Sequence, residues 1–184
     1  THCVVTEKTV FAMPETGIGL FPDVGGSYFL PRCPGRIGLF MALTGARLSA
    51  ADCLHAGIAT HSTSSEELEA LTASLADTSY GHDANGTVTD VLAAFSRDPG
   101  RSNLSASRPM LDEDFAGNSV EAVIGALQRR GGAWAETQLK ALSEKSPLSQ
   151  KVAARQLALG ASMSFDDCMV MEYRLSQRAM AGRD

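Results

Sequence analysis

The sequence predicts an α/β fold that is mostly helical and carries a few short strands at its start. Residues 1–61 begin with two β-rich runs and continue in short helical segments separated by Gly and Pro. Residues 62–184 consist of amphipathic helical segments that follow Ser, Asn or Asp residues suited to helix starts. We therefore divide the chain into a first region, 1–61, and a helical C-terminal region, 62–184.

Elements of the first region follow from its β-branched runs, its Gly and Pro stops and one Ser cap. The run from 36 to 43 is almost entirely apolar, which predicts a buried helix. In order, the predicted elements are strands at 3–5 and 9–12 around a turn, helices at 26–30, 36–43 and 49–56, and a strand at 58–60.

In the helical region, capping residues precede apolar residues at helical spacing. Residues 77–119 are richer in Gly, Asp, Asn and Ser, so we expect mostly loop there, with Asp112-Glu113-Asp114 in a solvated turn. The predicted helices run over 64–75, 88–95, 118–131, 134–142, 146–160 and 164–180.

Composition argues against several classes of function. The net charge of −5 gives no basic surface for nucleic acid, and no run approaches the roughly 20 apolar residues of a membrane span. The four cysteines are scattered without a C-x-x-C pair or a His cluster, so they predict neither a metal site nor a disulfide framework. The Ala- and Arg-leaning composition favours a cytoplasmic protein from a bacterium.

Residues 13–26, which we call the acidic loop, hold the clearest sign of chemistry. The loop is apolar, rich in Gly and Pro, and contains only two ionisable side chains, Glu15 and Asp23. A bent segment of this kind can aim both carboxylates into one poorly hydrated pocket, where desolvation raises a carboxyl pKa toward the range of a general acid or base. Two readings remain open: catalysis, or a helix cap at Asp23 and a solvated turn at Glu15.

Motifs along nearly the whole chain resemble the crotonase (enoyl-CoA hydratase/isomerase) superfamily, and within it most closely the 3-hydroxyisobutyryl-CoA hydrolases of valine breakdown. The resemblance includes Phe-Ala-Met-Pro-Glu at 11–15 and Gly-Leu-Phe-Pro-Asp-Val-Gly-Gly at 19–26. The other matching segments are 28–32, 42–45, 56–61, 146–147, 155–157 and 171–177.

This resemblance implies a crotonase-like spiral of ββα units that binds an acyl-CoA thioester, with two backbone N–H groups polarising the carbonyl. It implies that Glu15 is the main catalytic carboxylate, either activating water or attacking the thioester. Asp23 stands where the hydratases usually have Gly, so it favours hydrolysis and is expected to orient a 3-hydroxyacyl group. No cofactor is implied, because coenzyme A is part of the substrate.

Three further residues are expected at the substrate. Gly25 and Gly26 would let the backbone approach the acyl group at a helix N-terminus, although a plain tight turn explains them equally well. Phe21 is expected to line the acyl pocket, with core packing as the alternative.

In the family, the Gly-rich segment that polarises the thioester lies before the position of Thr1. The resemblance therefore implies a C-terminal portion that is inactive without the N-terminal half of the same protein. Its other partners would be the acyl-CoA substrate and further copies in a homo-oligomer. Two other functions remain open, namely an enoyl-CoA hydratase or isomerase and a non-catalytic helical assembly module.

Overall fold

Two short strands from distant parts of the sequence pair in parallel in the computed structural model, which describes residues 2–182. They are β1 (Val4–Thr6) and β2 (His61–Thr63). The predicted hairpin of 3–5 with 9–12 is wrong, because the second run contributes only an antiparallel bridge between Phe11 and Leu48. Parallel pairing requires a long connection between the strands, so the local pattern of β-rich runs does not indicate it.

Helical elements occupy most of the remaining described chain. The 3₁₀ helices are η1 (Glu15–Ile18), η2 (Leu30–Arg32) and η3 (Ser65–Glu67). The α-helices are α1 (Gly26–Phe29), α2 (Ile37–Thr44), α3 (Ala50–His55), α4 (Leu68–Asp77), α5 (Ala84–Ala94), α6 (Asn103–Asp114), α7 (Val120–Arg130), α8 (Gly132–Ser143), α9 (Pro147–Gly160) and α10 (Phe165–Ala181).

Most helix predictions are confirmed, including the all-apolar helix α2 and the Ser caps of α9 and α10. Within 77–119, α5 confirms the helix predicted at 88–95 and begins earlier, whereas the loop expected over the rest is wrong where α6 lies. Helix α6 is not apparent from the sequence because it contains many polar residues and an internal proline, Pro109, which normally disfavours a helix interior. Within residues 2–182, no helix combines the length and apolar character that crossing a membrane would require.

By its internal contacts the chain divides into two units. The first joins Thr1–Phe11 to Leu48–Ala106, and the second joins Ala12–Arg47 to Ser107–Asp184. The division drawn from sequence at residue 61 does not coincide with this one, because each unit takes segments from both sides of that residue.

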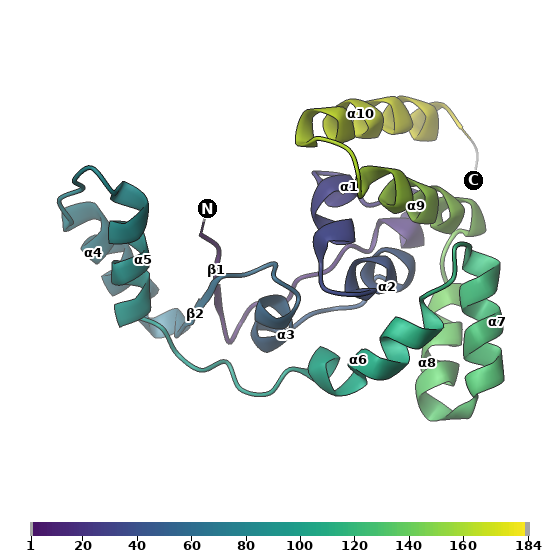
Figure 1. Cartoon of the computed structure of the whole chain (residues 1–184), viewed down its shortest axis with the longest axis horizontal. Coiled ribbons are helices and arrows are strands. Elements are labelled where there is room, and N and C mark those ends of the chain that lie inside the picture. Colours follow the sequence, from purple (N-terminus) through teal and green to yellow (C-terminus); the bar gives the residue numbers. More distant parts are fainter. Residues whose placement is uncertain (1, 183–184) are drawn as a thin grey trace. The chain divides into compact units, whose positions relative to one another are not determined.

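In the first unit, α3 packs against both strands, and α4 packs against α5 (Figure 1). The Asp52 carboxylate links α3 to the start of α6. It accepts hydrogen bonds from the Leu104 N–H at 3.0 Å, from the Ser102 hydroxyl at 2.8 Å and from the Ser49 hydroxyl at 2.8 Å. Burial alone would raise the pKa of Asp52, but these hydrogen bonds outweigh it and hold the pKa below its ordinary value.

The second unit has α2 in its core, in contact with α8, α9 and η1. Helix α1 lies against both α9 and α10, and α7 runs alongside α8 (Figure 1). Buried apolar side chains of α2, α7, α8 and α9 fill the space between these helices. They include Ile37, Met41, Leu43, Val123, Leu127, Ala135 and Ala153.

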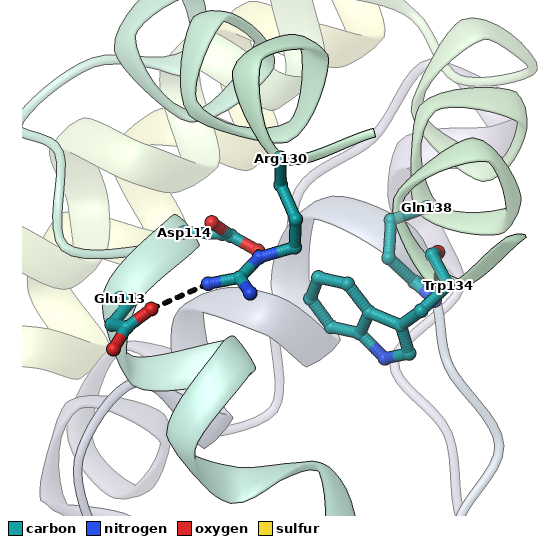
Figure 2. Close-up of polar contacts among 5 residues, drawn as sticks. All are labelled: Glu113, Asp114, Arg130, Trp134 and Gln138. Atoms are coloured by element: carbon teal, nitrogen blue, oxygen red, sulfur yellow. Dashed lines mark hydrogen bonds and ion pairs between the residues drawn. The ribbon is translucent and has the colours of Figure 1, made fainter. Parts of the chain in front are cut away.

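Figure 2 shows how the end of α6 is held against α7 in the second unit. Arg130 forms ion pairs with the buried carboxylate of Asp114 and, at 2.5 Å, with Glu113, while its guanidinium lies 6.0 Å from the centre of the Trp134 ring. The predicted solvated turn at 112–114 is therefore wrong, because these residues form the last turn of α6 and are paired. Hydrogen bonds to Asp114 and Glu113 raise the pKa of Arg130 and keep it charged.

Candidate active site

The acidic loop lies in the second unit and bends in two places. It begins with η1, which ends at Gly19 with a φ of 77°, and it turns again just before α1. Thr16, which is fully buried, fixes η1 in place: its carbonyl accepts the Ser146 N–H at 2.9 Å, and its hydroxyl donates to the Ala42 carbonyl at 3.4 Å. Glu15 is thus held against α2 and the start of α9 by its neighbour.

Glu15 is half-buried, and its Oε2 is buried without a hydrogen-bond partner among the described residues. Desolvation raises the pKa of the Glu15 carboxyl and outweighs the lowering by a hydrogen bond from its own backbone N–H, while the negative charge of Asp23 adds a smaller raising effect. A partly desolvated carboxylate with one unpaired oxygen and a raised pKa is suited to accept a proton.

Asp23 precedes a tight turn with an unusual backbone. Val24 has a φ of 46° and Gly25 a φ of 94°, and the Gly26 N–H donates to the Asp23 carbonyl at 2.7 Å. Two positive φ values in succession are those of a type I′ turn, which Gly or Asn normally occupies. A β-branched residue there is strained by on the order of 1–3 kcal/mol, and such strain is concentrated at functional sites.

The Asp23 side chain does not cap α1. The residue at the N-cap is Gly25, and no side chain of the turn bonds to the first N–H groups of the helix. The capping interpretation of Asp23 is therefore wrong, and its carboxylate is half-buried.

The two predicted substrate glycines use their N–H groups within the protein. Gly25 N–H donates to Glu172 at 3.0 Å, and Gly26 N–H donates to the Asp23 carbonyl. At Gly26 a Cβ atom would lie 3.0 Å from the Pro22 Cβ and 3.3 Å from the Met13 Cε, so close packing favours glycine there. These glycines shape the loop and do not present free donors.

Phe21 is 3% exposed and forms part of the wall of a groove of about 610 Å³. The groove lies between the acidic loop, α9 and α10, and it is lined mostly by apolar side chains. Burial of Phe21 and its position at the groove fit both roles expected from the sequence, core packing and contact with an acyl group.

Sequence reasoning did not assign a role to two buried polar residues beside the loop, Gln156 on α9 and Glu172 on α10. Both belong to the downstream segments that carry the family resemblance. The spacing of Cys168 and Glu172 could have indicated that Glu172 is buried. The two residues are one helical turn apart, so both lie on the inner face of α10. Within residues 2–182, no three His, Cys, Asp or Glu side chains gather as metal ligands.

The sequence matches the family described as enoyl-CoA hydratase/isomerase over residues 1–184. Curated relatives called "3-hydroxyisobutyryl-CoA hydrolase, mitochondrial" include proteins of Danio rerio, Xenopus laevis and Homo sapiens, which are 44%, 46% and 43% identical. Each alignment covers 98% of this chain and 48% of the relative, so the chain spans about half the length of the curated relatives it matches.

Two solved structures are also similar. A carnitinyl-CoA dehydratase from Mycobacterium thermoresistibile has a TM-score of 0.89 and 34% identity, covering 100% of this chain and 52% of its own. An enoyl-CoA hydratase from Rhodobacter sphaeroides 2.4.1 has a TM-score of 0.81 and 31% identity, covering 97% of this chain and 49% of its own.

The expectation of a bacterial, cytoplasmic protein is contradicted by the curated relatives, whose names are those of mitochondrial proteins of Danio rerio, Xenopus laevis and Homo sapiens. The expectation rested on the frequency of Ala and Arg. Residue frequencies reflect packing, charge and codon usage, and they do not specify a compartment.

Proposed function

Because the chain belongs to the enoyl-CoA hydratase/isomerase family and has its crotonase-type fold, we propose that it carries the catalytic carboxylates of an acyl-CoA thioester hydrolase. The observation that carries the proposal is that the Oε2 of Glu15 is buried without a partner among the described residues. Glu15 lies on the same loop as Asp23. Desolvation is the main cause that raises the pKa of the Glu15 carboxyl, and the charge of Asp23 raises it to a smaller extent. The substrate would be a short, branched 3-hydroxyacyl-CoA, of the kind in the relatives' names, and the reaction would then belong to valine catabolism.

In this proposal, Glu15 performs the chemical step in one of two ways. As a general base it takes a proton from water while the water oxygen bonds to the thioester carbon, the C–S bond breaks, and the leaving thiolate recovers the proton. As a nucleophile its own oxygen bonds to that carbon and expels the thiolate, and water then hydrolyses the acyl-enzyme anhydride. A raised pKa favours the first role, because it makes the carboxylate a stronger base.

Asp23 would orient the substrate by accepting a hydrogen bond from its 3-hydroxyl group. Its carboxylate is half-buried and is not used to cap α1, so it is available to a ligand. A charge-assisted hydrogen bond of this kind both fixes the acyl group and selects substrates that carry the hydroxyl. Phe21 would form part of the apolar wall against the branched acyl chain.

The donors that polarise the thioester carbonyl would come from other residues of the full-length protein. The N–H groups of Gly25 and Ser27 are bonded to Glu172, and that of Gly26 is bonded to the Asp23 carbonyl, so these three N–H groups are already used within the protein. We therefore expect residues 1–184 alone to release no CoA, and we expect no cofactor beyond the coenzyme A of the substrate.

The test compares two reactions of the full-length protein that contains this chain. Release of free CoA from 3-hydroxyisobutyryl-CoA is measured with a thiol reagent, and hydration of crotonyl-CoA is followed by loss of the enoyl absorbance. We expect CoA release to have the higher kcat/KM. Faster hydration would instead support an enoyl-CoA hydratase, which the similarity to a dehydratase and a hydratase structure keeps as the second candidate. Failure to bind either thioester would favour a helical assembly module.

A further inference from the structure

Glu172 on α10 holds the turn that follows Asp23. Its side chain is part of a residue only 5% exposed, and its two oxygens accept the Gly25 N–H at 3.0 Å and the Ser27 N–H at 2.9 Å. A carboxylate that accepts two backbone N–H groups through different oxygens fixes both the position and the rotation of that backbone. The residue lies 147 positions away from Gly25 in the sequence, so the contact is tertiary.

Gln156 on α9 holds the same turn at its other side. Its Nε2 donates to the Pro22 carbonyl and, at 2.6 Å, to the Ser27 hydroxyl. Pro22 immediately precedes Asp23, so the turn is bonded to α9 before Asp23 and to α10 after it. We call Gln156 and Glu172 the loop clamp.

The clamped turn is one that the local sequence disfavours. Val24 has positive φ and is 81% exposed, so neither its backbone preference nor burial of its side chain explains why it adopts this conformation. Strained residues persist where the surrounding structure fixes them, and here the surrounding bonds are those of the loop clamp.

We propose that Glu172 is a positioning residue for the thioesterase reaction, which holds Asp23 in the orientation that contacts the substrate. This inference rests on the proposed function. Glu172 is 5% exposed and both of its oxygens accept backbone N–H groups of the Asp23 turn, so its influence on the reaction passes through that turn.

The central experiment replaces Glu172 in the full-length protein by Gln, which removes the charge and one acceptor at nearly constant volume. Steady-state CoA release is measured for Glu172→Gln and for a matched control, Glu136→Gln, at an exposed residue of α8. We expect kcat to fall at least tenfold in Glu172→Gln and to stay within twofold of wild type in the control.

A pH profile separates positioning from a purely structural role. Asp23 raises the pKa of Glu15 by its charge, so displacing Asp23 should move the acidic limb of kcat/KM to lower pH. Loss of folded protein would instead lower the whole profile without moving the limb. The double variant Val24→Gly with Glu172→Gln adds a rescue test, because glycine adopts the positive φ freely and should recover part of kcat.

Three outcomes would overturn the inference: full activity in Glu172→Gln, an unmoved acidic limb, or absence of rescue by Val24→Gly. If Glu172→Gln does not fold, Glu172→Asp takes its place, because it keeps both acceptors and withdraws them by one methylene. Unfolding of both variants at the assay temperature would also count against a positioning role. If wild type hydrates crotonyl-CoA and releases no CoA, the proposed function fails. The rates of crotonyl-CoA hydration by wild type, Glu172→Gln and Glu136→Gln then test the role of Glu172 separately.

Discussion

Glu15 and Asp23 lie on one loop, and burial followed by the charge of Asp23 raises the pKa of the Glu15 carboxyl above its ordinary value. Neither side chain caps η1 or α1. The Glu15 Oε2 has no hydrogen-bond partner among the described residues. Stability poorly explains Glu15 in these conditions, because a desolvated carboxylate with an unpaired oxygen destabilises the fold that contains it.

Glu15→Gln should lower CoA release by the full-length protein by about 10²- to 10⁴-fold, the usual range for loss of a general base. The same change should raise the thermal unfolding midpoint at pH 7. A carboxyl whose folded pKa is raised contributes its stability below the unfolded-state pKa and loses it as pH rises through the folded pKa. The gain should therefore disappear as pH falls to 4.5, the ordinary value.

Thermal unfolding followed by circular dichroism at the two pH values checks this expectation, with Glu136→Gln at an exposed position as the control. A midpoint for Glu15→Gln that is lower than wild type at pH 7 would mean that the Glu15 carboxylate is stabilised by partners, contrary to the site described above.

Asp23→Asn should lower kcat/KM for 3-hydroxyisobutyryl-CoA by roughly 10- to 150-fold, the kinetic equivalent of losing about 1.5–3 kcal/mol in a charge-assisted hydrogen bond. Unfolding should change little, because the Asp23 side chain caps no helix. Asp23→Gly, which introduces the residue usual in hydratases, should impair hydrolysis at least as severely. Asp166→Asn, at an exposed position of α10, serves as control, and full turnover in both Asp23 variants would remove Asp23 from the mechanism.

Asp52→Ala should lower the free energy of unfolding by about 1–3 kcal/mol, because it leaves the buried N–H of Leu104 without its acceptor. The wild-type contribution is present above the unfolded-state pKa of about 3.8 and is lost as pH falls through the lower folded pKa. Urea unfolding at pH 7 and at acidic pH measures both effects. Asp90→Ala, at an exposed residue of α5, should stay within about 0.5 kcal/mol of wild type.

Gly160→Ala should destabilise the second unit by about 1–3 kcal/mol or more, through overpacking against α1. A Cβ at this last residue of α9 would lie 2.0 Å from the Ser27 carbonyl oxygen, a backbone atom that has no room to move. Gly125→Ala, within α7, is the matched control, since its Cβ would meet only the mobile end of Arg129 at 3.3 Å and helix propensity favours alanine. Equal stabilities of the two variants by urea unfolding would contradict the close approach of α9 to Ser27.

Local patterns in the sequence were sufficient for elements whose stability is local. Gly45 ends α2 with a φ of 67°, and Ser49 with Asp52 forms the predicted capping box of α3. Each of these depends on residues within a few positions of one another, so spacing alone reveals it. By contrast, α6 carries Pro109 and many polar residues, and its first turn is bonded to Asp52, which lies far back in the sequence.

By itself, the sequence determined the helical character of the chain, its family resemblance and the acidic loop with Glu15 and Asp23. These follow from composition, periodicity and residue order. Only the tertiary structure decided that β1 pairs with β2, that Asp23 is not a helix cap and that Glu15 has an unpaired buried oxygen. It also brought Gln156 and Glu172 to the turn after Asp23. The reason is physical: burial and hydrogen bonding across more than a hundred residues depend on which surfaces meet in three dimensions, and residue spacing does not encode that directly.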